Sequence, residues 1–112
     1  MANIIITNHA YSRMKERLGI KKKAADRIVE VAYEEGISHS ETSGRLNKYV
    51  SDKARAYMTK GYRIRIYGEA VYCFVEKGKK IVLVTVWHIP NNLKNQVIGL
   101  QKRKKEGLGK IV

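Results

Sequence analysis

The sequence has few cysteine, proline and acidic residues, and it has no long hydrophobic run. Its single cysteine, Cys73, excludes an internal disulfide framework and a cysteine-based zinc site. No apolar run approaches the ~18 residues of a membrane span, and residues 4–6 are too short a run for a secretory signal. The chain of 112 residues is 44% hydrophobic with one proline, which is typical of a folded chain. We therefore expect one globular domain that is cytoplasmic and not a membrane protein.

The shortage of acidic residues leaves a large positive charge. The chain carries 23 Lys and Arg against 10 Asp and Glu, which gives a formal net charge of +13. Such an excess attracts polyanions, so the candidate partners are RNA, DNA, a ribosome, an anionic membrane surface and an acidic protein. Solubility alone needs a net charge of about 2–8, so the charge favours a polyanionic partner over a purely solubilising role.

Hydrophobic spacing predicts an α+β fold. A strand comes first, over residues 3–7, and three helices follow, each closed by a glycine: residues 8–18, Lys22–Glu35 and 42–61. Three strands with tight turns between them come next: Tyr62–Tyr67, 70–76 and 81–88. We expect the N-terminal strand and the three helices to pack on one face of this antiparallel β-meander, as a single domain over residues 1–92.

Residues 93–112 are interpreted as a basic C-terminal tail. The tail contains four consecutive cations, Lys102, Arg103, Lys104 and Lys105. Three interpretations fit it: a solvated end, an arm that binds nucleic acid, or a helix that packs back onto the domain.

The two tight turns predict which residues of the sheet share a face. They pair Arg65 with Tyr72, Arg63 with Phe74, Tyr67 with Ala70, Phe74 with Leu83 and Tyr72 with Thr85. One face is then aliphatic and should pack against the helices, while the other carries Arg63, Arg65, Tyr72, Phe74, Leu83, Thr85 and Trp87. Arginines bind phosphates and exposed rings stack on unpaired bases, so this second face suits a nucleic acid. The alternative is a second, minor core covered by the tail.

The histidines are the candidate bases. His9, Arg13 and Arg17 lie at i, i+4 and i+8, along one face of the first helix. An imidazole at a helix N-terminus tends to stay neutral and can act as a general base; the alternative is an exposed histidine beside a solvated arginine stripe. His88 ends the last strand, where it is either a catalytic group or a histidine that closes the core. His39 lies in a polar connector, which favours no catalytic role.

Several chemistries lack their motifs. No cluster of His, Cys, Asp and Glu has metal-ligand spacing, and there is neither a phosphate loop nor a dinucleotide fingerprint. Cys73 faces the predicted core, which argues against a thiol nucleophile. We therefore expect no metal and no cofactor. The remaining His, Arg, Lys and Tyr suffice for metal-free RNA cleavage, in which the RNA supplies its own 2′-OH nucleophile.

These residues also carry a resemblance to a known group. The motif His-Ala-x-x-Arg-x-x-x-Arg over residues 9–17, two further helices, and the meander from Arg63-Ile64-Arg65 to Val84-Thr85-Val86 resemble the RelE/ParE toxin superfamily. More broadly, they resemble the barnase–colicin–RelE group of metal-independent ribonucleases. The resemblance covers about residues 4–90, and it implies helices on a curved sheet that holds RNA. It further implies that Arg63 and Arg65 bind phosphate, and that His9 and Arg13 form the polar pair of the first helix.

The first functional hypothesis is a metal-independent endoribonuclease of toxin type, from a plasmid, phage or other mobile element. Arg63 and Arg65 would hold the phosphate, while His9 or His88 shares proton transfer with Tyr72. Further binding residues would be Arg13, Arg17, Thr85, Trp87 and the tail cations Lys102, Arg103, Lys104 and Lys105. The partners would be RNA or a ribosome, with an acidic antitoxin.

Two other hypotheses come from different classes of protein. One is a non-catalytic binder of nucleic acid or ribonucleoprotein, such as a phage- or mobile-element-encoded inhibitor of a host defence system. The other is an interaction module for an acidic partner protein. Histidines that converge on the arginines and tyrosines would favour the enzyme, and histidines on opposite sides of the fold would favour the binder.

Overall fold

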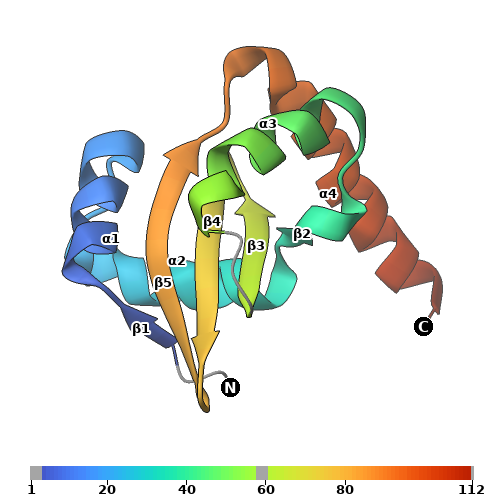
Figure 1. Ribbon diagram of the computed structural model, residues 1–112. Helices are drawn as coiled ribbons and strands as arrows, with labels where there is room; N and C mark the ends of the chain where they lie inside the picture. Colours follow the sequence, from blue (N-terminus) through green and yellow to red (C-terminus); the bar gives the residue numbers. More distant parts are fainter. Residues whose placement is uncertain (1–3, 58–60, 112) are drawn as a thin grey trace.

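Five strands form one sheet in the order β1-β5-β4-β3-β2 (Figure 1). The computed structural model describes residues 4–57 and 61–111, with side chains as far as Lys104 in the last helix. The strands are β1 (Ile4–Ile6), β2 (Ile37–Ser38), β3 (Tyr62–Tyr67), β4 (Ala70–Lys77) and β5 (Lys80–His88). β1 runs parallel to β5, whereas the other neighbours are antiparallel. The predicted α+β class and the three-stranded meander are confirmed.

Helices precede and follow the meander. They are α1 (Asn8–Arg13), which continues as a π-helical turn η1 (Met14–Leu18), then α2 (Lys22–Glu35), α3 (Gly44–Ala54) and α4 (Asn91–Ile111), with short 3₁₀ turns η2 (His39–Glu41) and η3 (Arg55–Tyr57). The Thr7 hydroxyl accepts a hydrogen bond from the Ala10 N–H at 3.0 Å and so caps α1. Gly19 ends η1 with a φ of 68°, which favours glycine. The third helix is shorter than predicted, since its α-helical part ends at Ala54.

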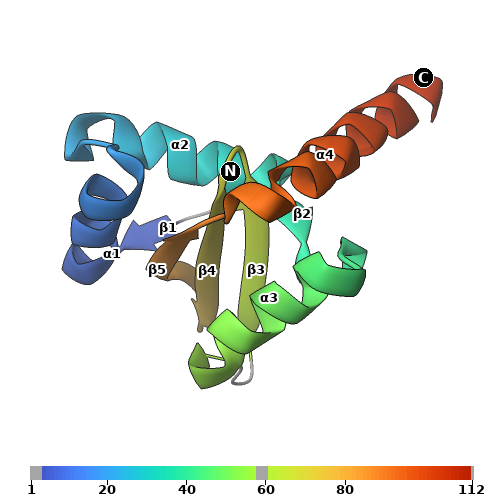
Figure 2. The ribbon, with the colours of Figure 1, turned by 90° about the horizontal axis from the view of Figure 1, so that it is seen from above.

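Helices lie on both faces of the sheet. Figure 2 shows α1 and α2 on one side and α3 on the other. The first group encloses a core with Tyr72, Phe74 and Leu83, while α3 and α4 enclose a second core with Val71 and Cys73. The expectation that the N-terminal strand and three helices pack on one face therefore needs correction: β1 pairs with β5 within the sheet, and helices cover both faces. The face of Tyr72, Phe74 and Leu83, predicted to hold a nucleic acid, is a core covered by α1 and α2. The physical reason is that β4 is apolar on both sides, and each side requires a cover.

A β-bulge in β5 changes the predicted register. The pairs Arg65–Tyr72, Arg63–Phe74, Tyr67–Ala70 and Phe74–Leu83 are confirmed. The pair Tyr72–Thr85 is wrong, because Tyr72 faces Val86 and Cys73 faces Thr85, with Val84 as the extra residue between them. Because of this one extra residue, each later side chain of β5 lies on the face opposite to the predicted one. Thr85 and Trp87 therefore lie on the Cys73 side of the sheet.

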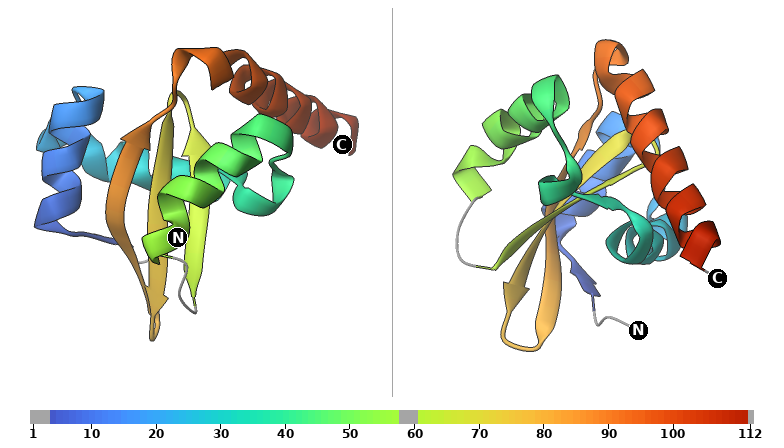
Figure 3. Two further views of the ribbon diagram at one scale, coloured as in Figure 1. Left: turned by 45° about the horizontal axis from the view of Figure 1, so that its top comes forward. Right: turned by 90° about the vertical axis from the view of Figure 1, so that its right-hand side faces the viewer.

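The segment after Pro90 is a helix that packs back onto the domain. Leu93 and Val97 of α4 are buried and Leu100 is partly buried, all in the second core. Figure 3 shows α4 running from the end of β5 toward the C-terminal end of α2. The boundary of a tail at residue 93 thus falls inside α4, which begins at Asn91. In the part of the chain that the structure describes, no helix is both long enough and apolar enough to cross a membrane.

Candidate functional site

A cleft of about 330 Å³ opens where β3 turns into β4 and where β5 ends. We call it the turn cleft. Its walls come from the end of η1, from α2, from the β3–β4 turn and from the last residue of β5. The lining residues are Arg17, Leu18, Ile20, Ile28, Tyr67, Gly68, Glu69, Ala70, Tyr72 and His88. The cleft therefore joins three of the side chains that the sequence singles out, namely Arg17, Tyr72 and His88.

Arg17 provides the cation of the turn cleft. Its Nη1 donates a hydrogen bond to the backbone carbonyl of Val86 at 2.8 Å. Among the described residues this is its one hydrogen bond, and a guanidinium has five N–H donors. The bond orients the group while most of its donors stay available for a ligand. Sequence reasoning assigned Arg17 to nucleic-acid binding, and its place in the cleft is compatible with that prediction.

Tyr72 contributes a neutral phenol to the lining of the turn cleft. Its side chain is buried, with 2% of its surface exposed. Burial first, and the nearby Tyr67 second, raise the pKa of Tyr72 to about 12. The phenol therefore keeps its proton at neutral pH, so it can donate a hydrogen bond or a proton but cannot serve as a base.

His88 is exposed at the end of β5 and lines the turn cleft. The alternative of a histidine that closes the core is therefore wrong. The Tyr49 hydroxyl donates to the His88 carbonyl at 3.0 Å, which anchors the backbone from the α3 side. Imidazole is the side-chain group that accepts a proton most readily near neutral pH, so His88 is the candidate base of this cleft.

The β3–β4 turn forms the part of the lining beside His88, and contacts from β5 and α4 hold it. The Ile89 N–H donates to the Glu69 carbonyl at 2.8 Å, and Gln101 Nε2 donates to the Gly68 carbonyl at 3.4 Å. The Glu69 carboxylate forms an ion pair with Lys94 Nζ at 3.2 Å. Sequence reasoning missed Glu69 and Tyr67 as lining residues. The Gly68-Glu69 turn was predictable, but its contact with α4 and its place in the same cleft as residues of η1 depend on the tertiary structure.

A second cleft, of about 370 Å³, lies at the β2–β3 edge of the sheet, and we call it the edge cleft. It is lined by Ser38, His39, Ser40, Tyr62, Arg63, Ile64 and Arg65.

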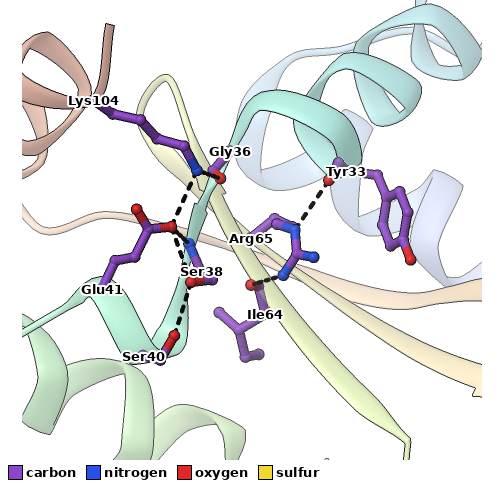
Figure 4. A network of polar contacts seen from close by, with 8 residues as sticks. All are labelled: Tyr33, Gly36, Ser38, Ser40, Glu41, Ile64, Arg65 and Lys104. Atoms are coloured by element: carbon purple, nitrogen blue, oxygen red, sulfur yellow. Dashed lines mark hydrogen bonds and ion pairs between the residues drawn. The ribbon is translucent and has the colours of Figure 1, made fainter. Parts of the chain in front are cut away.

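Arg65 donates from Nε to the Tyr33 carbonyl and from Nη1 to the Ile64 carbonyl, both at 3.0 Å (Figure 4). Its guanidinium also lies over the Tyr33 ring, 5.2 Å from the centroid. Arg63 donates to Glu76 at 2.6 Å in an ion pair. Both predicted phosphate-binding arginines thus have partners inside the protein.

His39 is also occupied by partners. Its Nε2 lies 3.0 Å from the Ser51 hydroxyl and its Nδ1 lies 3.4 Å from the Tyr62 hydroxyl. Partial burial lowers the pKa of His39, which favours the uncharged ring. These contacts give His39 a structural role, which the sequence did not indicate.

Lys104 joins α4 to the end of α2, as Figure 4 shows. Its Nζ donates to the Gly36 carbonyl at 2.9 Å and to Glu41 at 3.1 Å. The same Glu41 oxygen accepts hydrogen bonds from the Ser38 N–H and hydroxyl, both at 2.9 Å. Burial opposes ionisation of Glu41, but the Ser38 and Lys104 hydrogen bonds outweigh it and lower its pKa. Lys104 therefore has a structural role in addition to its predicted role in nucleic-acid binding.

The remaining predicted residues lie elsewhere. His9 is exposed at the start of α1, and Arg13 pairs with Glu16 at 2.8 Å, so neither lines either cleft. Thr85 is buried and Trp87 packs edge-to-face on Tyr57 at 5.8 Å, because the bulge turns both into the second core. Thr85 is buried and lines neither cleft, so its prediction as a nucleic-acid contact needs correction, whereas Trp87 is partly exposed but also lies outside both clefts. Lys102 and Arg103 are exposed on α4, and the Lys105 side chain lies outside the described residues.

The described parts of the chain, residues 4–57 and 61–111, contain no group of three His, Cys, Asp or Glu side chains placed to hold a metal ion. None of the family models, curated proteins and solved structures compared with the chain matches it.

Proposed function

We propose that this protein binds RNA and cleaves it at the turn cleft, without a metal ion, by attack of the 2′-OH on the adjacent phosphate. The observation that carries the proposal is the meeting of Arg17, Tyr72 and His88 in one cleft. This reaction requires a base, an acid and a cation, and an imidazole, a neutral phenol and a guanidinium can supply them. The net charge of +13 supports a polyanionic substrate.

Each of the three side chains has a distinct role in the reaction. His88 accepts the proton of the 2′-OH, whose oxygen forms a bond to phosphorus. Arg17 binds the phosphate oxygens as negative charge develops on them. The bond from phosphorus to the 5′ oxygen breaks, and that oxygen takes the proton of Tyr72. His88 then returns its proton to the Tyr72 phenolate, which leaves a 2′,3′-cyclic phosphate and a free 5′-OH.

The resemblance to the RelE/ParE superfamily supports an RNA substrate and adds candidate partners, but not this site, because Arg63, Arg65, His9 and Arg13, to which it assigns roles, lie outside the lining of the turn cleft. A toxin of this type would act in the cytoplasm, on free or ribosome-bound RNA, and an acidic antitoxin would neutralise it. The positive surface suits both partners, since each carries negative charge.

The test is incubation of the purified protein with a mixed RNA pool in EDTA, with and without ribosomes. We expect RNA fragments with 2′,3′-cyclic phosphate ends and no cleavage of DNA, which lacks the 2′-OH. His88→Ala should abolish cleavage, whereas His9→Ala, a matched histidine outside the cleft, should leave it unchanged. Cleavage that depends on His9 and not on His88 would contradict the proposed site.

A second candidate function is a non-catalytic binder of RNA or ribonucleoprotein, including an inhibitor of a host defence system. The observation that favours it is the absence of His9, Arg63 and Arg65 from the lining of the turn cleft, which leaves a single imidazole there. RNA that is bound but stays intact, with and without ribosomes, would favour the binder over the enzyme.

A further inference from the structure

The turn between β4 and β5 carries a compact group of positive charges, Lys77, Lys79 and Lys80, which we call the lysine tip. Gly78 and Lys79 form the turn, and Lys77 lies directly opposite Lys80 in the register of the two strands. All three lysines are exposed. Figures 1 and 3 show that this hairpin extends beyond the helices at one end of the sheet. The lysine tip is therefore open to a large ligand.

The described residues provide no counter-ion for the lysine tip. Ion pairs occur at several places in residues 4–57 and 61–104, and none of them includes Lys77, Lys79 or Lys80. The nearest carboxylate along β4 is that of Glu76, and it is bound to Arg63 Nη2 at 2.6 Å. The positive charge of the tip is thus left to solvent or to a ligand.

The backbone holds the three lysines close together. Gly78 has a φ of 60°, which suits the two-residue turn of a hairpin. The Glu76 N–H donates to the Gly61 carbonyl at 2.8 Å and so fixes the base of the hairpin. Like charges that lie directly opposite each other on neighbouring strands repel and destabilise the pair. A bound anion removes this repulsion, and the fixed backbone reduces the ordering cost of binding it.

The composition of the tip favours a phosphate backbone over a protein or a membrane. A lysine ammonium binds phosphate as a point charge. Protein interfaces are depleted in lysine and depend on aromatic and arginine anchors, and membrane-surface segments add apolar side chains that enter the interface. The turn Lys77-Gly78-Lys79-Lys80 contains no aromatic, arginine or apolar side chain. It therefore suits a nucleic acid that is bound through its phosphates.

We infer that the lysine tip is a second RNA contact, separate from the turn cleft, which binds the phosphate backbone without reading the bases. The tip and His88 lie at opposite ends of β5 (Lys80–His88), about 26 Å apart at about 3.3 Å per residue. A stacked strand advances about 3.4 Å per nucleotide, so a dinucleotide in the cleft does not reach the tip, whereas a much longer RNA does. This inference rests on the RNA-binding part of the proposed function.

The experiment compares the wild type with the triple variant Lys77→Gln/Lys79→Gln/Lys80→Gln. Two ligands are used, an oligomer of about 20 nucleotides and a dinucleotide, both of 2′-O-methyl RNA, which blocks the attack and separates binding from cleavage. We expect the variant to bind the long oligomer about tenfold more weakly at low salt. The slope of log K against log [salt] should be smaller by about 2, because three phosphate contacts are lost. The affinity for the dinucleotide should not change.

The matched control removes the same charge from helix α3, in the triple variant Lys48→Gln/Lys53→Gln/Arg55→Gln. These cations are also exposed, but each has a partner: Lys48 and Arg55 pair with Asp52, and Lys53 lies over the Tyr49 ring. The control should retain most of the salt slope. The melting temperature should also separate the two variants, since loss of the cross-strand repulsion should raise it in the tip variant and loss of the partners should lower it in the control.

The possible results separate the inference from the proposed function. Equal weakening in the two triple variants would show that net charge alone sets the affinity, and would overturn the lysine tip as a contact. Unchanged binding in the tip variant, together with RNA cleavage by the wild type, would overturn the inference and leave the proposed function intact. Tip-dependent binding to vesicles of phosphatidylcholine and phosphatidylserine, without tip-dependent RNA binding, would replace RNA by a membrane surface. An absence of both RNA binding and cleavage would overturn the proposed function, and the inference with it.

Discussion

The turn cleft and the edge cleft each combine arginine, histidine and tyrosine side chains, and they differ in how many of these already have partners in the protein. In the edge cleft, Arg65 is bound to two backbone carbonyls and Arg63 to Glu76, while both ring nitrogens of His39 face hydroxyl groups. In the turn cleft, Arg17 makes one described hydrogen bond and His88 is exposed.

This difference separates side chains that hold the fold from side chains that are free to act on a ligand. Arg65 satisfies the carbonyl at the C-terminal end of α2, where backbone acceptors lack partners within the helix. A ligand phosphate would have to compete with those bonds for its guanidinium. Arg17 has no such pair of bonds to lose, which is why the proposed chemistry is placed in the turn cleft.

The largest effect is expected from a matched pair of arginine variants. Arg17→Ala should lower the single-turnover rate of RNA cleavage by about 10²–10³, because one donor to the developing charge is lost. Arg65→Ala should leave the rate of the folded fraction within a few-fold of the wild-type rate. The opposite order of the two rates would transfer the chemistry to the edge cleft.

The free energy of unfolding should show the reverse order, with a larger loss for the Arg65 variant than for the Arg17 variant. Arg65→Met should lower the free energy of unfolding by about 1–3 kcal/mol, because the Tyr33 and Ile64 carbonyls lose their donor. Arg17→Met removes one bond at an exposed side chain and should cost about 0.5–1.5 kcal/mol. Urea denaturation monitored by circular dichroism measures both values. Equal losses would show that Arg65 is no more structural than Arg17.

Helix α4 offers the same comparison between exposed cations, Lys102 and Arg103, and a bonded cation, Lys104. The double variant Lys102→Gln/Arg103→Gln removes two exposed charges and should weaken RNA binding several-fold, with a salt slope that falls by about 1.4. Lys104→Gln should act mainly on stability, since it breaks the bonds to Gly36 and Glu41. Binding measured over a series of salt concentrations tests the first result. An unchanged slope would exclude α4 from the RNA-binding surface.

The smallest effect is expected in the pH dependence of stability, through His39 of the edge cleft. Burial lowers the pKa of His39 below its ordinary value of 6.5, so the unfolded chain binds its proton at a higher pH than the folded protein does. The contribution of His39 to stability is therefore fully present above 6.5 and is lost as the pH falls through the folded-state pKa. We expect a lower melting temperature in mildly acidic buffer, and His39→Asn should reduce that pH dependence. A pH dependence that is the same in the variant would contradict this assignment.

Local signals were sufficient to predict most of the fold. The bounds of α2 and the pairing across the β3–β4 turn each depend on residues close together in the sequence, and the structure agrees with them. The helical spacing of Leu93, Val97 and Leu100 was also present, but it lay within a basic segment and was interpreted only as one of three alternatives.

The faces of β5 and the composition of the site depended on tertiary structure. The extra residue Val84 has no local signal that distinguishes it from a regular strand position, and it moved Thr85 and Trp87 into a core. Arg17, Tyr72 and His88 were identified separately from their residue types. Their meeting in one cleft depends on the packing of η1 against the sheet, which no spacing in the sequence indicates.

The central claim, that the turn cleft and not the edge cleft receives RNA, is tested most directly by nuclear magnetic resonance. A short RNA with a 2′-deoxy nucleotide at the reactive position is titrated into the isotope-labelled protein, and the backbone amide shifts are followed. The account predicts the largest shifts at Arg17, at residues 67–70 of the turn and at His88. Shifts confined to Ser38, His39 and residues 62–65 would contradict it.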